Sequence, residues 1–184
     1  SDQIRTATQR CSHEHRNDRT REIICIKKYL EDGVKKDGLT PYVRAISEIF
    51  SEDDSVGKGI TRCHDILHAV GQTAGADSRN LNDTISQCTE FCTSGCYHGV
   101  VEGYVARGRD FVAEIPNLCK TASPGTTAYD GCFHGLGHGI ASVAGFEINN
   151  ALELCDKIES DDGKLQCGFG VFMELFEPSS FIHP

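Results

Sequence analysis

Hydrophobic side chains recur along this chain at the spacing of an α-helix. Ile23, Ile26 and Leu30 fall on one helical face, and Val43 and Ile46 begin a second such face. No segment alternates convincingly between hydrophobic and polar residues, as a half-buried strand would. The pattern therefore predicts an all-α protein.

A short motif that begins with cysteine returns along the chain. The four copies begin at Cys63, Cys96, Cys132 and Cys167. Their first residues are separated by 33, 36 and 35 positions. A period of about 35 residues is typical of a helical hairpin, and such hairpins stack because one alone cannot bury its hydrophobic face. We therefore predict stacked helical hairpins in one compact domain, residues 21–184, after a polar N-terminal tail, residues 1–20.

Cysteine is the outlier in the composition, with ten among 184 residues. No two cysteines have the C-x-x-C spacing of zinc ribbons or thioredoxin-like motifs. An even number of cysteines spread along the chain favours disulfides, which form in oxidising compartments. We therefore expect a protein that is secreted, periplasmic or otherwise extracytoplasmic.

Two disulfide schemes fit the repeat. In the first, a preceding cysteine pairs with the cysteine that opens each copy: Cys25–Cys63, Cys88–Cys96, Cys119–Cys132 and Cys155–Cys167. This scheme leaves Cys11 and Cys92 over. In the second, each copy is joined to the segment that follows it: Cys63–Cys88, Cys96–Cys119 and Cys132–Cys155. Spacing alone does not distinguish them.

Charge narrows the range of partners. The chain has 18 Lys and Arg against 27 Asp and Glu, a net charge of −9. An acidic chain is a poor partner for a nucleic-acid backbone. It has no run of about 18 apolar residues, so no transmembrane segment is expected. Whether the protein acts on a small-molecule substrate or binds a protein partner is left undecided by the charge.

Histidine and glutamate occupy equivalent places in three copies of the motif, as pairs spaced i, i+4. On a helix such a pair lies on one face about 6 Å apart, so that both side chains can reach one metal ion. If the helices pack around a common centre, the pairs converge on one or two transition-metal ions, and imidazole ligands suit zinc, copper or iron. The candidate ligands are His64, His68, His98, Glu102, His134 and His138, with Glu174 as a possible further carboxylate.

The last copy departs from this pattern. Its positions equivalent to the ligand pair hold Phe169 and Met173, which are both apolar. Glu174 stands one residue further, about 100° around a helix. The first copy departs as well, because His64 follows its cysteine by one residue instead of two.

The ligand list resembles that of hemerythrin-type diiron sites, in which histidines and bridging carboxylates come from four helices. The resemblance covers only the H-x-x-x-E and H-x-x-x-H pairs, because the repeat framework and the separation between the pairs do not match that family. It is an analogy of site chemistry, and it implies iron as the metal.

Two functions remain open at this point. One is a metal-binding protein with a mono- or dinuclear centre, which as an enzyme would be hydrolytic or oxygen-activating. The other is a non-catalytic, disulfide-stapled helical module that binds a protein or a glycan. Pairs that point inward and converge favour the metal, whereas pairs spread over a surface favour the module. No separate nucleophile or general base is identifiable, so the catalytic residues are unknown.

Overall fold

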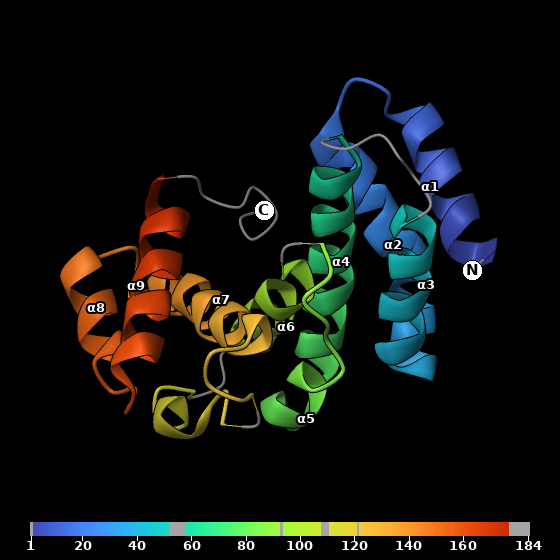
Figure 1. Ribbon diagram of the computed structural model, residues 1–184. Helices are drawn as coiled ribbons and strands as arrows, with labels where there is room; N and C mark the ends of the chain where they lie inside the picture. The colour runs from blue at the N-terminus through green and yellow to red at the C-terminus, as the bar shows by residue number, and fades with distance from the viewer. Residues whose placement is uncertain (1, 52–57, 93, 108–110, 121, 177–184) are drawn as a thin grey trace.

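The computed structural model describes residues 2–51, 58–92, 94–107, 111–120 and 122–176, with the backbone alone for 58–61. The described residues form nine α-helices and a short 3-10 turn, with no strand (Figure 1). The prediction of an all-α fold is confirmed. The elements in chain order are α1 (Asp2–Glu14), α2 (Arg19–Asp37), α3 (Thr40–Ser51), α4 (Lys58–Asp77), α5 (Leu81–Ile85), α6 (Gly95–Val105), η1 (Ile115–Asn117), α7 (Thr127–Val143), α8 (Ile148–Cys155) and α9 (Asp161–Phe176).

Local sequence explains several of the helix ends. Asp18 opens α2 by accepting a hydrogen bond from the backbone N–H of Arg21 at 3.0 Å, and Thr126 opens α7 in the same way. These side chains satisfy N–H groups that have no partner in the first turn of a helix. Gly38 follows α2 with φ of 81°, a conformation that glycine adopts without strain.

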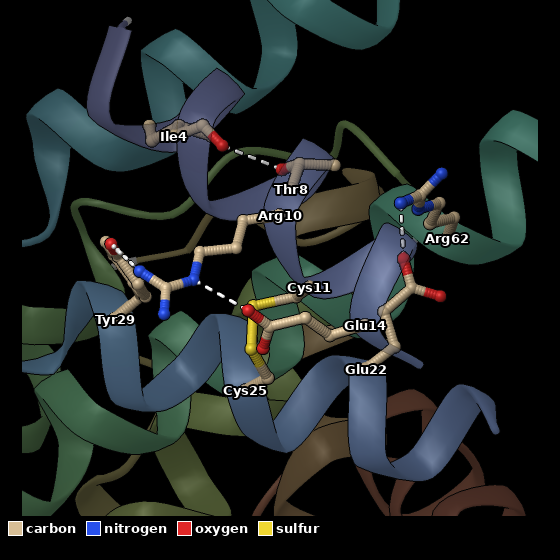
Figure 2. Close-up of a disulfide and its surroundings, with 9 residues drawn as sticks. All are labelled: Ile4, Thr8, Arg10, Cys11, Glu14, Glu22, Cys25, Tyr29 and Arg62. Atoms are coloured by element: carbon tan, nitrogen blue, oxygen red, sulfur yellow. Dashed lines mark hydrogen bonds and ion pairs between the residues drawn. A yellow bond between two sulfur atoms is a disulfide. The ribbon is translucent and has the colours of Figure 1, made fainter. Parts of the chain in front are cut away.

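Residues 2–14, within the segment expected as a polar tail, form α1. Ile4, Ala7 and Cys11 share its buried face, and Cys11 forms a disulfide with Cys25 of α2 (Figure 2). The pairing of Cys25 with Cys63 was therefore wrong. The division of the chain into a tail and one domain stays a prediction.

Five disulfides connect the ten cysteines. Three of them are the pairs expected in the first scheme: Cys88–Cys96, Cys119–Cys132 and Cys155–Cys167. The fourth joins Cys63 to Cys92, so the second scheme was wrong. Each of the three expected bridges joins a cysteine of α6, α7 or α9 to a cysteine that precedes that helix in the chain. Five disulfides fit a protein of an oxidising compartment.

The centre of the molecule is a row of four helices, in which α6 and α7 lie between α4 and α9 (Figure 1). Glycines hold α6 against α4. A Cβ added at Gly99 would lie 2.0 Å from the carbonyl oxygen of His68, and one added at Gly103 would lie 2.1 Å from that of Gln72. Since the contacts advance together along both helices, α4 and α6 run in the same direction. Gly131, Gly135 and Gly139 face α6 from α7: an added Cβ would meet backbone atoms at Gly135, the nearest at 3.0 Å, and side chains at the other two.

The crossing of α4 with α6 recurs between α7 and α9. A Cβ added at Gly170 would lie 2.0 Å from the carbonyl oxygen of His134, as one at Gly99 would from that of His68. A shift of 66 residues thus relates α4 to α7 (His68 to His134), and a shift of 71 residues relates α6 to α9 (Gly99 to Gly170). The two helix pairs are two copies of one arrangement.

None of the described helices is both long and apolar enough to cross a membrane.

Candidate metal centre

All seven candidate ligands lie together where α4, α6, α7 and α9 meet. His68, His98, Glu102, His138 and Glu174 are buried, while His64 and His134 are half-buried at the edge of the cluster. The close approach of the helices explains this convergence, because each histidine of α6 and α7 stands next to a glycine that touches the neighbouring helix. The side chains are therefore positioned by packed backbone instead of by loops.

One side of the cluster consists of imidazoles. The ring of His98 lies 4.9 Å from that of His134 and 5.0 Å from that of His138, between centroids. The rings of His134 and His138 are 5.1 Å apart. Each of the three offers a nitrogen within 4.8 Å of the other two, so the group could hold a metal ion. His64 stands beside it, with its ring centroid 5.2 Å from that of His98.

The other side of the cluster consists of carboxylates. Glu174 Oε2 lies 2.7 Å from Nδ1 of His138, and Glu102 Oε1 lies 3.8 Å from the same nitrogen. These three residues form a second group whose ligand atoms lie within 4.8 Å of one another. His138 belongs to both groups. Its Nδ1 faces the carboxylates, and its buried Nε2 has no hydrogen-bond partner among the described residues.

Two side chains contact the same carboxylate oxygen of Glu102. Nε2 of His68 lies 2.9 Å from Glu102 Oε2, and the side-chain amide of Gln72 donates to the same oxygen at 2.9 Å. Gln72 in turn accepts a hydrogen bond from Nζ of Lys27 at 2.8 Å. The other oxygen, Oε1, is buried and receives no hydrogen bond within the described part of the chain.

Burial and neighbouring charges divide the histidines into two kinds. Burial and the nearby imidazoles hold the pKa of His98 well below its usual range and lower the pKa of His134 to about 4. Both are therefore neutral at pH 7. Burial alone would also lower the pKa of His68, but the Glu102 carboxylate outweighs it and raises that pKa. Burial opposes ionisation of Glu102 as well, and His68 overcomes it and lowers the pKa of the carboxyl group.

Glu174 belongs to the cluster although the repeat pattern put Phe169 and Met173 at the ligand positions. The side chains of Phe169 and Met173 are exposed, whereas Glu174 is fully buried. Under the shift that relates α6 to α9, Glu174 corresponds to Gly103, which lies in the contact between α4 and α6. Glu174 accordingly lies between α7 and α9 and reaches His138 from there.

Gln72 is a residue of the cluster that sequence reasoning missed. It stands four residues after His68 and so continues the stripe of His64 and His68 along one face of α4. Its spacing was the available signal, but an amide is not a usual ligand for a transition metal.

A further group, made of Glu14, His15 and Cys25, lies at the junction of α1 and α2. Cys25 is bonded to Cys11 (Figure 2), so its sulfur is not a thiolate ligand. Arg10 also donates to Glu14 at 2.8 Å and to the hydroxyl of Tyr29 at 3.0 Å. We therefore place no metal there.

Comparisons with models of known protein families, with curated proteins and with solved structures found no match. The fold and the site alone define the class: an all-helical, disulfide-rich protein with buried His and Glu groups that could hold a metal ion.

Proposed function

We propose that this protein binds a transition-metal ion through the imidazoles of His98, His134 and His138. The observation that carries the proposal is Nε2 of His138, a buried nitrogen with no hydrogen-bond partner among the described residues and two further imidazoles beside it. A buried polar atom left in this way costs about 1–3 kcal/mol, and a bound ion would remove that cost.

Glu174 supports this assignment by fixing the state of the His138 ring. A neutral imidazole carries one proton, and Nδ1–H would donate it to Glu174 across 2.7 Å. Nε2 is then unprotonated and free to bind the ion. Histidine ligands of metals almost always donate their other nitrogen to such an acceptor, which orients the ring and increases its basicity.

The protonation of the other two histidines also supports a metal. A histidine must be neutral to act as a ligand, and the lowered pKa values of His98 and His134 keep both neutral well below pH 7. A set of neutral imidazoles suits zinc, copper or iron. In an oxidising compartment we favour zinc or copper over ferrous iron.

Three nitrogen ligands leave a coordination position for water or a substrate. Zinc at such a position would lower the pKa of a bound water and so support hydrolysis, whereas copper or iron would bind or activate oxygen. His64 and His134 are half-buried and mark the side from which a small molecule would approach. The inward direction of the ligand pairs argues against the alternative of a module that binds partners through these side chains.

Metal analysis of protein purified without a histidine tag tests the proposal. The wild type should retain close to one or more ions per chain, and His98→Ala and His134→Ala should each lose most of the metal. Helicity and disulfides should be unchanged in both, because the five bridges hold the fold independently. His13→Ala, at an exposed site on α1, is the matched control and should keep its metal. Full occupancy in both cluster variants, or a wild type that takes up no Zn²⁺, Cu²⁺ or Fe²⁺ at neutral pH, would contradict the proposal.

A further inference from the structure

We infer that His138 joins two metal ions, one at each ring nitrogen, with the second ion held by Glu102 and Glu174. This inference rests on the proposed function, since it adds a second ion on the other side of the same ring. The two groups that could hold a metal share His138 and no other residue.

The first argument is an oxygen of Glu102 that no described residue satisfies. Its Oε2 is already engaged by His68 and Gln72, at 2.9 Å each. Its Oε1 is buried, receives no hydrogen bond from a described residue and lies 3.8 Å from Nδ1 of His138. A single ion at Nε2 leaves this carboxylate oxygen without a partner in the described part of the chain. A second ion next to Nδ1 gives it one.

The second argument is charge. Glu102 and Glu174 are 3% and 0% exposed and lie on either side of the same nitrogen. Buried carboxylates are stable only when they are paired or coordinate a metal. Glu102 has His68 beside it, and Glu174 has His138. A cation among the two carboxylates and Nδ1 would be attracted by both negative charges.

Binding of the second ion exchanges the proton on Nδ1 of His138 for the metal. When the second ion binds, Nδ1 of His138 loses its proton to solvent and the ring becomes a bridging imidazolate. The ion gains one nitrogen and two carboxylate oxygens as ligands, a mixed set that zinc and copper accept. The first ion keeps its three imidazoles.

Metal-stripped protein titrated with Cu²⁺ tests the bridge, with bound copper counted after dialysis. The wild type should bind two ions per chain, and Glu102→Gln should bind one. In the wild type the electron paramagnetic resonance signal should grow with the first equivalent and fall with the second, because an imidazolate bridge couples the two unpaired electrons. Glu153→Gln, at an exposed position of α8, is the matched control and should behave as the wild type.

The outcomes separate this inference from the proposed function. A wild type that binds one ion, which Glu102→Gln also binds, overturns the bridge and leaves the three-histidine site standing. Two ions with a full, uncoupled signal also overturn the bridge. A wild type that binds no copper or zinc overturns both.

A second, independent observation concerns the outer face of α9, defined here as Leu165, Phe169, Phe172, Met173 and Phe176. We propose that this face binds the same face of a second copy of the chain. Its side chains are between 40% and 79% exposed. A helix that is apolar on all sides is normally buried, and the opposite side of α9 already packs against α7.

The equivalence of α6 and α9 indicates what packs on the outer face of α9. The shift that relates α6 to α9 places it at the positions of Ser94, His98, Val101, Glu102 and Val105. Four of these, all but Glu102, lie within 4 Å of a Cβ added at a glycine of α7. The outer face of α9 is thus the position on which a following helix packs, and the described chain has no helix there.

Spacing and area favour a second copy as the occupant. Leu165, Phe169, Phe172 and Phe176 follow one another by four, three and four residues, which is the seam of a coiled coil. Such a seam is apolar along its whole length, so two copies can pack symmetrically. With about 200 Å² for a fully exposed aromatic side chain, the face offers about 500 Å² per copy. Two copies would bury about 1,000 Å², the lower limit for a specific interface.

Sedimentation equilibrium of the full chain, with and without metal, tests the dimer. The wild type should be a dimer at micromolar concentration, and Phe169→Glu should be a monomer with unchanged helicity. Ile24 of α2 has the same exposed fraction as Phe169, 52%, so Ile24→Glu is the matched control and should stay dimeric. A monomeric wild type overturns the proposal, and binding of that monomer to phosphatidylcholine vesicles would assign the face to a lipid surface. A Phe169→Glu variant that remains dimeric overturns it as well.

Discussion

The glycine contacts between the central helices lead to a quantitative prediction about stability. A methyl group at Gly99 would lie 2.0 Å from the carbonyl oxygen of His68 and 2.8 Å from the backbone nitrogen of Gln72. Ordinary contact begins at 3.4 Å, so the shorter distance must grow by about 1.4 Å. Both clashing atoms belong to the backbone of α4, and no side-chain rotation relieves them. α4 and α6 must therefore move apart.

We expect Gly99→Ala to lower the free energy of unfolding by about 2 kcal/mol. Overpacking a core costs about 1–3 kcal/mol, and a clash with rigid backbone belongs at the upper end of that range. Alanine offsets part of the cost, because it favours a helix by about 1 kcal/mol over glycine. The same separation of helices should weaken metal binding, since His98 stands beside Gly99.

Gly168 of α9 provides the matched control. A Cβ added there would meet no atom closer than Leu152 Cδ2 at 3.8 Å, so Gly168→Ala should show only the helix propensity and gain up to about 1 kcal/mol. Urea unfolding of metal-free, disulfide-intact protein, followed by circular dichroism, should separate the two variants by about 3 kcal/mol. Stabilities equal within about 0.5 kcal/mol would refute the role assigned to the glycine contact.

Three further predictions follow from the site and the bridges. The native state keeps His98 and His134 neutral while the unfolded chain takes up protons below pH 6.5, so metal-free protein should lose stability as the pH falls from 6.5 to about 4. At about 1.4 kcal/mol for each pH unit, His134 contributes up to about 3 kcal/mol, and urea unfolding of His134→Asn should show a correspondingly flatter pH profile. Glu174→Gln should weaken the three-histidine ion by about 10–100-fold in a competition titration with a chelator, with helicity retained. Replacing Cys11 and Cys25 together by serine should cost about 3 kcal/mol in urea unfolding, and limited proteolysis should then release α1 while the metal content is kept.

The helical pattern was enough to predict the all-α fold. The cysteine spacing left two disulfide schemes open, and one of them contains three of the five disulfides. The bridge from Cys11 was missed because its segment is polar overall. Ile4, Ala7 and Cys11 nevertheless have the spacing of one helical face, so the signal for α1 was present.

The inward direction of the ligands could be proposed from the sequence, but the sequence alone does not decide it. It depends on which side of each helix touches the next, and that is decided by the backbone contacts of Gly99, Gly135 and Gly170. Glu174 shows what the sequence repeat alone does not predict. The repeat correctly aligned Phe169 and Met173 with the ligand positions of α6, but those positions on α9 face outward because no described helix follows.

The equivalence of the two helix pairs places Gln72 where the second pair has His138. The same helix crossing thus carries an amide in one copy and an imidazole in the other. The glycine contacts that make the crossing are equivalent in both copies. The two copies differ in their chemistry: α4 supplies His68 and Gln72, which hold the Glu102 carboxylate in place, and α7 supplies two of the three nitrogens that would bind an ion. In such a scaffold the packing of the helices does not depend on the side chains of the site. Ligand residues at one crossing can therefore be replaced while the other crossing keeps the protein folded.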